Sequence, residues 1–329
     1  MKIIIVGSGL SGITAARLLT DLGHHVTIYE SRNHIGGNCY DSNVCGVTMH
    51  NYGPHIFHTD DEEVFSFLSR FTEWIPFELK PVGNTNIGMI SLPYSKKTIK
   101  QLKRELSQDE IVDYIFKDYS EKQWGVNFEE IPKTITNRIP KTKDCEDPTW
   151  FEGQKYQCIP KDGYTSMFIR MVEGITVKLN CDKDDWKKAE ADLVIYTGKI
   201  DEFYDYRFGQ LPYRSLKFEH EITPQKQNTF IVNECNLDNK HTRQYDHSYF
   251  TPGHKGVTVI TKEYPKQATK EDIPFYPIPW GESQQIYNKY EALAKSEPRI
   301  IFVGRLATYK YLDMWMAIKQ VMLKLKGQF

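Results

Sequence analysis

The fold is decided by the stretch Ile3-Ile4-Ile5-Val6-Gly7-Ser8-Gly9-Leu10-Ser11-Gly12. The apolar run predicts a buried strand, and the glycines after it predict a tight turn that opens a helix over Ser11 to Leu22. In this G-x-G-x-x-G pattern Gly7 permits the turn, Gly9 lets a pyrophosphate approach the backbone, and Gly12 lets the helix pack close to the strand. The pattern therefore predicts a Rossmann-like α/β domain that binds a dinucleotide at a helix N-terminus.

The residues after the second predicted strand indicate which dinucleotide is bound. That strand, His25 to Tyr29, ends at Glu30, whose carboxylate can accept hydrogen bonds from ribose hydroxyls and would repel a 2′-phosphate. This favours FAD or NAD over NADP. The Arg and the Gly-Gly pair that follow resemble flavoproteins of the glutathione-reductase and amine-oxidase type, which favours FAD over NAD. The predicted cofactor residues in this part of the chain are Gly7, Gly9, Gly12, Glu30, Arg32, Gly36, Gly37 and Asn38.

Composition narrows the class of protein. The 329 residues predict two or three domains, and 40% hydrophobic with 26% charged residues is typical of a soluble globular protein. A net charge of −1 indicates neither a nucleic-acid partner nor a membrane surface. The six cysteines form no C-x-x-C pair, which argues against a zinc site or redox dithiol and favours free thiols. With no signal peptide and no bilayer-spanning run, we expect a cytoplasmic protein without a metal.

Apolar patterns predict that the dinucleotide domain is discontinuous. Further buried strands are expected at 192–198 and 299–305, and a last helix over Asp313 to Lys326. One insertion is predicted to be helical, with near-helical apolar spacing over Thr98 to Tyr119 and a helix N-terminus at Ser107, which acids follow. Alternating residues such as 215–222 predict an antiparallel sheet domain. The predicted domains are an FAD-binding domain at 1–76, 159–202 and 282–329, a small helical insertion at 96–137, and a sheet and substrate domain at 77–95, 138–158 and 203–281.

Several strings of residues recur in an order that identifies a family. They are 32–38 (RNHIGGN), 52–59 (YGPHIFHT), 119–125 (YSEKQWG), 138–140 (RIP), 163–165 (GYT), 205–209 (DYRFG), 213–219 (YRSLKFE), 261–265 (TKEYP) and 304–311 (GRLATYKY). Together they closely resemble the bacterial UDP-galactopyranose mutase family. The resemblance runs from Met1 nearly to the end of the sequence.

The resemblance implies an isomerase that interconverts the pyranose and furanose rings of UDP-galactose without net redox change. It implies reduced FAD, with NAD(P)H or another donor as the reductant. The flavin N5 would attack the anomeric carbon and displace UDP, forming a sugar adduct that opens and recloses through O4. UDP-arabinopyranose or UDP-N-acetylgalactosamine would undergo the same chemistry, and the residues do not distinguish these sugars.

The resemblance also implies roles for particular residues. Arg138 and Arg243 correspond to the arginines that bind the diphosphate, although taken alone they are more typical of surface ion pairs. His55 and His58 would lie beside the flavin ring, where lone histidines are otherwise more often structural. The other substrate residues that it implies are Phe116, Tyr119, Trp124, Trp150, Tyr276 and Tyr311. Further cofactor residues would be Gly304, Arg305, Asp313 and Met314.

Two departures from the family pattern leave alternatives open. Trp150 stands where the family more often has Tyr, and an indole can donate a hydrogen bond but cannot accept one. The helical insertion is also shorter than usual, so we expect a monomer or a dimer that differs from the usual one. An amine-oxidase-like oxidoreductase fits the glycine motifs but not the paired arginines. A non-catalytic UDP-sugar binder is the third possibility.

Overall fold

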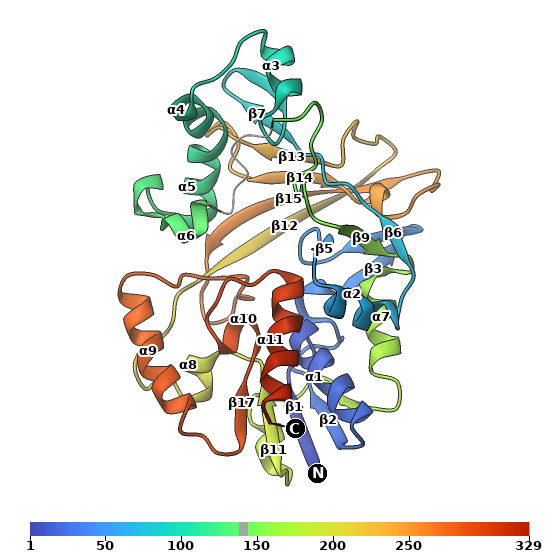
Figure 1. Cartoon of the computed structure of the whole chain (residues 1–329), viewed down its shortest axis with the longest axis vertical. Helices are drawn as coiled ribbons and strands as arrows, with labels where there is room; N and C mark the ends of the chain where they lie inside the picture. Colours follow the sequence, from blue (N-terminus) through green and yellow to red (C-terminus); the bar gives the residue numbers. More distant parts are fainter. Residues whose placement is uncertain (138–143, 329) are drawn as a thin grey trace.

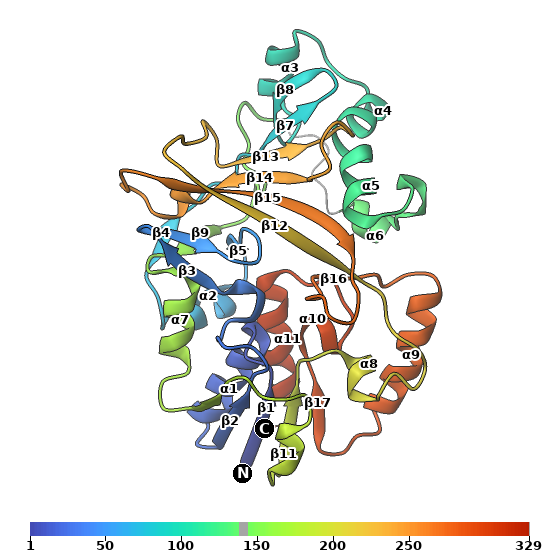
Figure 2. The same ribbon diagram turned by 180° about the vertical axis from the view of Figure 1, so that it is seen from behind.

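A computed structural model of the chain describes residues 1–137 and 144–328. The molecule has two tiers (Figure 1). A parallel sheet with its helices forms the lower tier, and a larger sheet with a helical cap forms the upper one. Seen from behind in Figure 2, the long strands of the upper sheet cross diagonally above the lower tier.

The lower tier contains five parallel strands in the order β10-β2-β1-β11-β17. They are β1 Lys2–Val6, β2 His25–Tyr29, β10 Thr176–Lys178, β11 Leu193–Tyr196 and β17 Ile300–Phe302. Side chains alternate along β1, so Ile3 and Ile5 share a core with helices α1 (Leu10–Asp21) and α11 (Met314–Lys326). Ile4 faces the opposite core, which includes residues of α9 (Glu282–Ala294). A strand covered on both faces is typical of parallel sheets, so the predicted α/β domain is present.

The parallel sheet combines strands from three separate parts of the chain, as the sequence analysis predicted for a discontinuous dinucleotide domain. The division of the residues into three domains stays a prediction. Its boundary at residues 158/159 falls within β9, which pairs with β5 and β6 in a separate three-stranded sheet.

The upper tier is a seven-stranded sheet in the order β16-β12-β15-β14-β13-β7-β8. Its strands are β7 Val82–Thr85, β8 Gly88–Ser91, β12 Tyr213–Thr223, β13 Ile231–Glu234, β14 Arg243–Asp246, β15 Thr258–Gln267 and β16 Tyr276–Pro277. Neighbouring strands run antiparallel, as predicted, except that β13 and β7 are parallel. Through this pair, β7 and β8, which precede the helical cap, join the hairpin formed by β13 and β14.

The cap is helical, as predicted, and residues 98–119 form several short helices, one of which starts at Ser107 as expected. Helix α3 (Lys96–Leu102) stops where Lys103 takes a left-handed conformation with φ of 57°. Ser107 then starts a new helix, in which its side chain and that of Glu110 cap each other's backbone N–H groups. The cap elements that follow are α4 Gln108–Ile111, the π-helix η2 Val112–Lys117, α5 Asp118–Trp124, η3 Phe128–Glu130 and α6 Lys133–Thr136.

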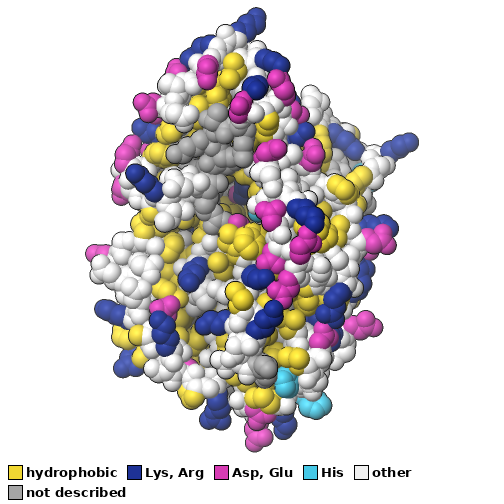
Figure 3. All heavy atoms as spheres, viewed as in Figure 1, with side chains coloured by type: hydrophobic (Ala, Val, Ile, Leu, Met, Phe, Trp, Pro, Cys, Tyr) yellow, Lys and Arg dark blue, Asp and Glu magenta, His cyan; other side chains and the backbone are white. Residues whose placement is uncertain are grey.

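The remaining elements are short strands and helices. The strands are β3 Asp41–Val44, β4 Val47–His50, β5 Phe57–Thr59, β6 Trp74–Pro76 and β9 Tyr156–Pro160. The helices are η1 Gly37–Cys39, α2 Glu62–Ser69, α7 Gly163–Met171, η4 Asp185–Lys188, α8 Ile200–Phe203, η5 His247–Phe250 and α10 Gly304–Ala307. Within the described ranges, no helix has both the length and the apolar character needed to cross a bilayer. On the face shown in Figure 3, acidic and basic side chains are interspersed.

The glycine turn yields a testable prediction about stability. A Cβ at Gly12 would lie 2.0 Å from the carbonyl oxygen of Gly7, which is backbone and cannot swing aside. Gly12→Ala should therefore lower the free energy of unfolding by about 1–3 kcal/mol, measured by urea denaturation. Gly327→Ala is the control, because its Cβ would meet only ordinary contacts at 3.8 Å. Equal stabilities for the two variants would contradict the packing argument.

Candidate active site

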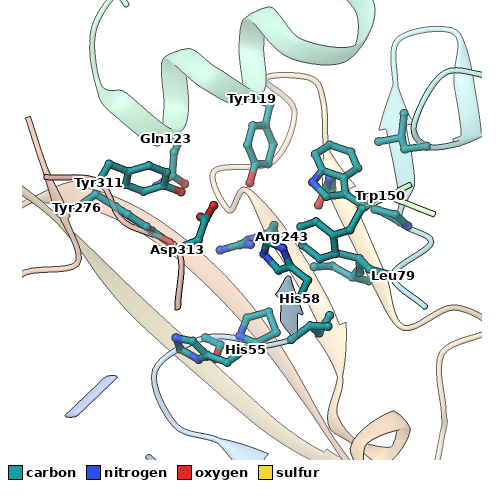
Figure 4. Close-up of a pocket in the computed structure, with 18 of the residues that line it drawn as sticks. His55, His58, Leu79, Tyr119, Gln123, Trp150, Arg243, Tyr276, Tyr311 and Asp313 are labelled. Carbon is teal, nitrogen blue, oxygen red and sulfur yellow. The ribbon is translucent and has the colours of Figure 1, made fainter. Parts of the chain in front are cut away.

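A cavity of about 790 Å³ lies between the tiers and is lined by residues of both. Figure 4 shows Arg243 near its centre, with Tyr119 above, Tyr276 and Tyr311 to one side and His55 below. The lower tier contributes Asn38, Arg305, Asp313 and Met314. The cavity thus brings together residues that the sequence separates by more than two hundred positions.

The glycine turn lies at the carboxyl end of β1. Gly7 has φ of 95°, in the left-handed region that favours glycine, and its N–H donates to Tyr29 O at 2.8 Å. Helix α1 then begins with Gly9 as its N-cap, and the structure shows no side-chain hydrogen bond to that cap among the described residues. The backbone N–H groups of the first turn are therefore suited to an anionic ligand.

Glu30 lies at the end of β2 beside this turn and is 5% exposed. Its Oε2 accepts hydrogen bonds from the backbone N–H and the hydroxyl of Ser8, both at 2.7 Å. Its Oε1 accepts from the backbone N–H of Arg32 at 2.9 Å. The carboxylate thus braces the glycine turn, and its predicted contact with a ribose stays a prediction.

The second glycine pair packs against the first turn. The N–H of Gly36 donates to Ser8 O at 2.9 Å, and a Cβ at Gly37 would lie only 2.8 Å from the Cα of Gly9. Arg32 is fixed beside this cradle by a 2.8 Å hydrogen bond from Nη2 to Asn38 Oδ1. Its buried Nη1 has no hydrogen-bond partner among the described residues. A tight backbone cradle with an available guanidinium donor fits the diphosphate of a flavin dinucleotide.

Arg305 connects this cradle to the aromatic part of the cavity. Its guanidinium donates to Phe275 O at 2.9 Å and Leu312 O at 2.6 Å. It also lies over the rings of Tyr276 and Tyr311, at 5.7 and 5.5 Å from their centroids. The adjoining Gly304 packs close to Ser11 of α1, and Asp313 is the N-cap of α11. Their predicted contacts with a cofactor stay predictions.

Arg243 is the cationic group on the upper wall of the cavity. It is directly opposite Glu263 in the β14–β15 register, and its Nε and Nη2 donate to Glu263 Oε1 at 3.1 and 2.5 Å. Burial alone would lower the pKa of Arg243, but the carboxylate of Glu263 holds it well above its usual value. Glu263 has no exposed surface, and its Oε2 has no hydrogen-bond partner among the described residues. Glu263 therefore fixes the position of the Arg243 guanidinium in the cavity and keeps it protonated.

Aromatic side chains surround this charge. Trp124 makes edge contacts with Tyr276 and Tyr311, with centroids 6.1 Å apart in each case. Burial raises the pKa of Tyr119 to about 12, so this hydroxyl keeps its proton at neutral pH. The cavity is also lined by the predicted substrate residues Phe116 and Trp150, and by Gln123, Asn233 and Phe151, which the sequence analysis missed.

His55 and His58 both line the cavity. His55 Nδ1 lies 2.8 Å from Gly53 O, which requires the ring proton on Nδ1, and burial lowers the pKa of His55 to about 4. The imidazole is therefore neutral at physiological pH. His58 stacks on Phe151 with centroids 3.6 Å apart, and its Nδ1 lies 2.7 Å from Gln154 Oε1.

Two further points concern the predicted residues. Arg138, the partner expected for Arg243, lies outside the described residues. Glu263 was missed as a site residue although it belongs to the string 261–265. Next to Lys262 on an alternating strand, it had no sequence feature that distinguished a buried charge from a solvated one.

Comparisons with known proteins identify the family of the chain. The family model for UDP-galactopyranose mutase matches residues 114–311, and a model for an NAD(P)-binding Rossmann-like domain matches residues 5–71. A dTDP-fucopyranose mutase of Escherichia coli is 36% identical, over 97% of this chain and 96% of its own length. The "Probable UDP-galactopyranose mutase" of Klebsiella pneumoniae is 35% identical, over 98% and 93%.

A solved structure shares the fold over nearly the whole chain. The crystal structure of reduced UDP-galactopyranose mutase aligns with 99% of this chain and 96% of its own, with a TM-score of 0.70 at 15% identity. From the family model and the full-length relatives, we conclude that this chain belongs to the UDP-galactopyranose mutase family.

Proposed function

We propose that this enzyme interconverts the pyranose and furanose forms of UDP-galactose, using reduced FAD and with no net redox change. The observation that carries the proposal is Arg243, held by the buried Glu263 in an aromatic-walled cavity whose lining also includes Asn38, which accepts a hydrogen bond from Arg32 beside the glycine cradle. A diphosphate bound at Arg243 would hold its sugar between the upper wall and a cofactor seated below. An amine-oxidase reaction does not require a diphosphate-binding arginine, and a cationic guanidinium would repel an ammonium substrate.

The glycine turn, Glu30 and the cradle at Arg32 and Gly37 would hold the dinucleotide. The cradle at Arg32 and Gly37 favours FAD over NAD as that dinucleotide. When bound and reduced, FAD would supply through N5 the nucleophile for the anomeric carbon, from which UDP departs and to which it returns. We propose NAD(P)H or another soluble donor as the reductant.

The protein's own residues would bind, orient and exclude water. Arg243 would pair with the diphosphate oxygens, and the hydroxyls of Tyr276 and Tyr311 would donate to them. Phe116, Tyr119 and Trp124 would enclose the nucleoside and sugar. Arg138, the second arginine of the family pattern, would complete the diphosphate site.

His55 would act as a neutral hydrogen-bonding group beside the flavin. With its proton fixed on Nδ1 by Gly53 O, its Nε2 is an acceptor. His58, stacked on Phe151, would form the adjacent wall. In the lower wall, Arg305 and the N-terminus of α11 would favour an anionic reduced flavin, because positive charge and the helix dipole both stabilise an anion.

The relatives favour a second candidate substrate. The chain is as similar to a protein named dTDP-fucopyranose mutase as to a protein named for UDP-galactopyranose. UDP-arabinopyranose and UDP-N-acetylgalactosamine remain further candidates for the same reaction. With the short helical cap, we also expect a monomer or a dimer that differs from the usual family dimer.

The reaction can be tested directly. Purified protein should show a flavin absorption spectrum, and after dithionite reduction it should convert UDP-galactofuranose to UDP-galactopyranose, followed by HPLC. The oxidised protein is the control and should be inactive. Turnover of dTDP-fucofuranose but not of UDP-galactofuranose would assign the second candidate, and amine-dependent oxygen consumption would overturn both.

Arg243 should contribute strongly to UDP binding, and because its removal leaves the buried Glu263 without its cation, affinity is compared on folded protein that retains its flavin. Arg243→Ala is expected to weaken UDP binding roughly 10- to 100-fold by calorimetry, because charge-assisted hydrogen bonds contribute about 1.5–3 kcal/mol. The matched control is Arg207→Ala, since Arg207 is exposed and lies against Phe208 away from the cavity. If the two variants bind UDP equally well, the assigned role of Arg243 is wrong.

Arg305 should raise the reduction potential of the bound flavin. Removing its positive charge in Arg305→Met should make the reduction potential more negative, measured by spectroelectrochemical titration, because an anionic reduced flavin loses a nearby cation. Arg305→Lys keeps the charge and should retain most of the potential. A potential unchanged in Arg305→Met would contradict this role.

A further inference from the structure

Lys122, in the string 119–125, makes contacts that the proposed function does not explain. Within the described chain, its ammonium group donates to four backbone carbonyl oxygens of one segment. They are those of Glu234 at 3.0 Å, Asn236 at 2.6 Å, Asn239 at 3.0 Å and His241 at 3.2 Å. All four lie in residues 234–241, which connect β13 to β14. We call this arrangement the carbonyl cage.

The cage has the chemistry of a monovalent cation site. Converging carbonyl dipoles can replace the hydration shell of a cation, and an ammonium has three N–H donors to share among the oxygens. The Lys122 side chain is only partly exposed; burial lowers its pKa, and the nearby Glu234 carboxylate opposes that shift. Without a cation, these carbonyls would lose a charge-assisted partner. The chain therefore fills its own cation site.

Other contacts also hold the caged segment. Glu234 organises it from within, because its Oε2 accepts from Asn84 Nδ2 at 2.8 Å and Asn239 Nδ2 at 2.9 Å, and Cys235 packs in the cap core beside Phe116. Arg214 of β12 donates to Gln123 O at 2.8 Å and Lys122 O at 3.2 Å. Within the described residues, α5 is thus fastened to the sheet by Arg214 and to the caged segment by Lys122.

The two elements that the cage joins carry opposite parts of the cavity wall. Helix α5 carries Tyr119, Gln123 and Trp124, and β14 begins with Arg243, two residues after the last caged carbonyl. Both views place α5 beside the ends of β13 and β14 (Figures 1 and 2). In Figure 4 Tyr119 points toward Arg243 across the cavity. The separation of these side chains therefore depends on how the segment meets the helix.

We propose that Lys122 is a positioning residue whose ammonium acts as a built-in cation: it fastens residues 234–241 to α5 and so fixes Arg243 relative to Tyr119 and Trp124. The inference rests on the proposed function, because its consequence is the affinity for UDP. A displacement of about 1 Å between groups that hold one ligand is enough to weaken binding strongly.

The experiment removes the ammonium and then returns it. Lys122→Ala, purified with its flavin, should bind UDP roughly 10- to 100-fold more weakly than the unsubstituted protein by calorimetry, with an unchanged flavin spectrum. Adding n-propylammonium chloride, which replaces the missing part of the side chain, should restore much of the affinity. Neither 1-propanol, which lacks the charge, nor tetramethylammonium, which lacks N–H donors, should do so.

A matched control is Lys117→Ala at the end of η2, five residues before Lys122, because Lys117 is paired with Glu129 and not with the cage. It should bind UDP normally and show no response to n-propylammonium. Lys122→Gln is the second variant, since its amide supplies fewer donors and no charge, and it should bind with intermediate affinity.

Each outcome decides the proposal. Unchanged UDP affinity in Lys122→Ala, or equal restoration by 1-propanol or tetramethylammonium, would overturn it. Loss of bound flavin in both Lys122 variants would assign the residue to the stability of the whole fold, which also overturns it. If the unsubstituted protein fails to bind UDP, the proposed function fails, and that result is distinct from all of these.

Discussion

The site depends on the pairing of Arg243 with Glu263. A lone guanidinium in an aromatic-walled cavity would lose much of its hydration, and a buried carboxylate offsets that loss. The antiparallel register of β14 and β15 places the two residues opposite each other, so the sheet itself aligns the charges. Replacing such a pair with apolar residues often leaves stability unchanged or improves it. The contribution of this pair is therefore to position the Arg243 guanidinium at the cavity wall rather than to stabilise the fold.

Local patterns made the lower tier predictable. The run of isoleucines, the glycine turn and the acid at the end of β2 all lie within thirty residues, and each has one simple structural cause. The start of α1 was predicted within one residue, and the last helix was predicted with Asp313 at its beginning. In the cap, the helix start at Ser107 was predicted from the residue and the acids that follow it, whereas apolar spacing did not reveal the left-handed turn at Lys103 that ends α3.

The upper wall could be predicted only through family resemblance. Arg243 and Glu263 are twenty residues apart on different strands, and neither composition nor spacing reveals a register between strands. The carbonyl cage is harder still, because its acceptors are backbone atoms whose positions no side-chain pattern records. Trp150 shows the opposite case: the departure from the family was visible, and the structure still brings its side chain to the cavity.

The interleaved lower sheet has a consequence for how the protein is made. Strands β1, β11 and the edge strand β17 come from the beginning, the middle and the last part of the sequence, and α11 packs against α1. A chain emerging from the ribosome can form the upper sheet while β11 still lacks its neighbour β17 and α1 still lacks α11. The dinucleotide domain, although encoded first, is therefore completed last. Until residues 300–326 have emerged, the core around Ile5 and Ile13 stays open to premature contacts.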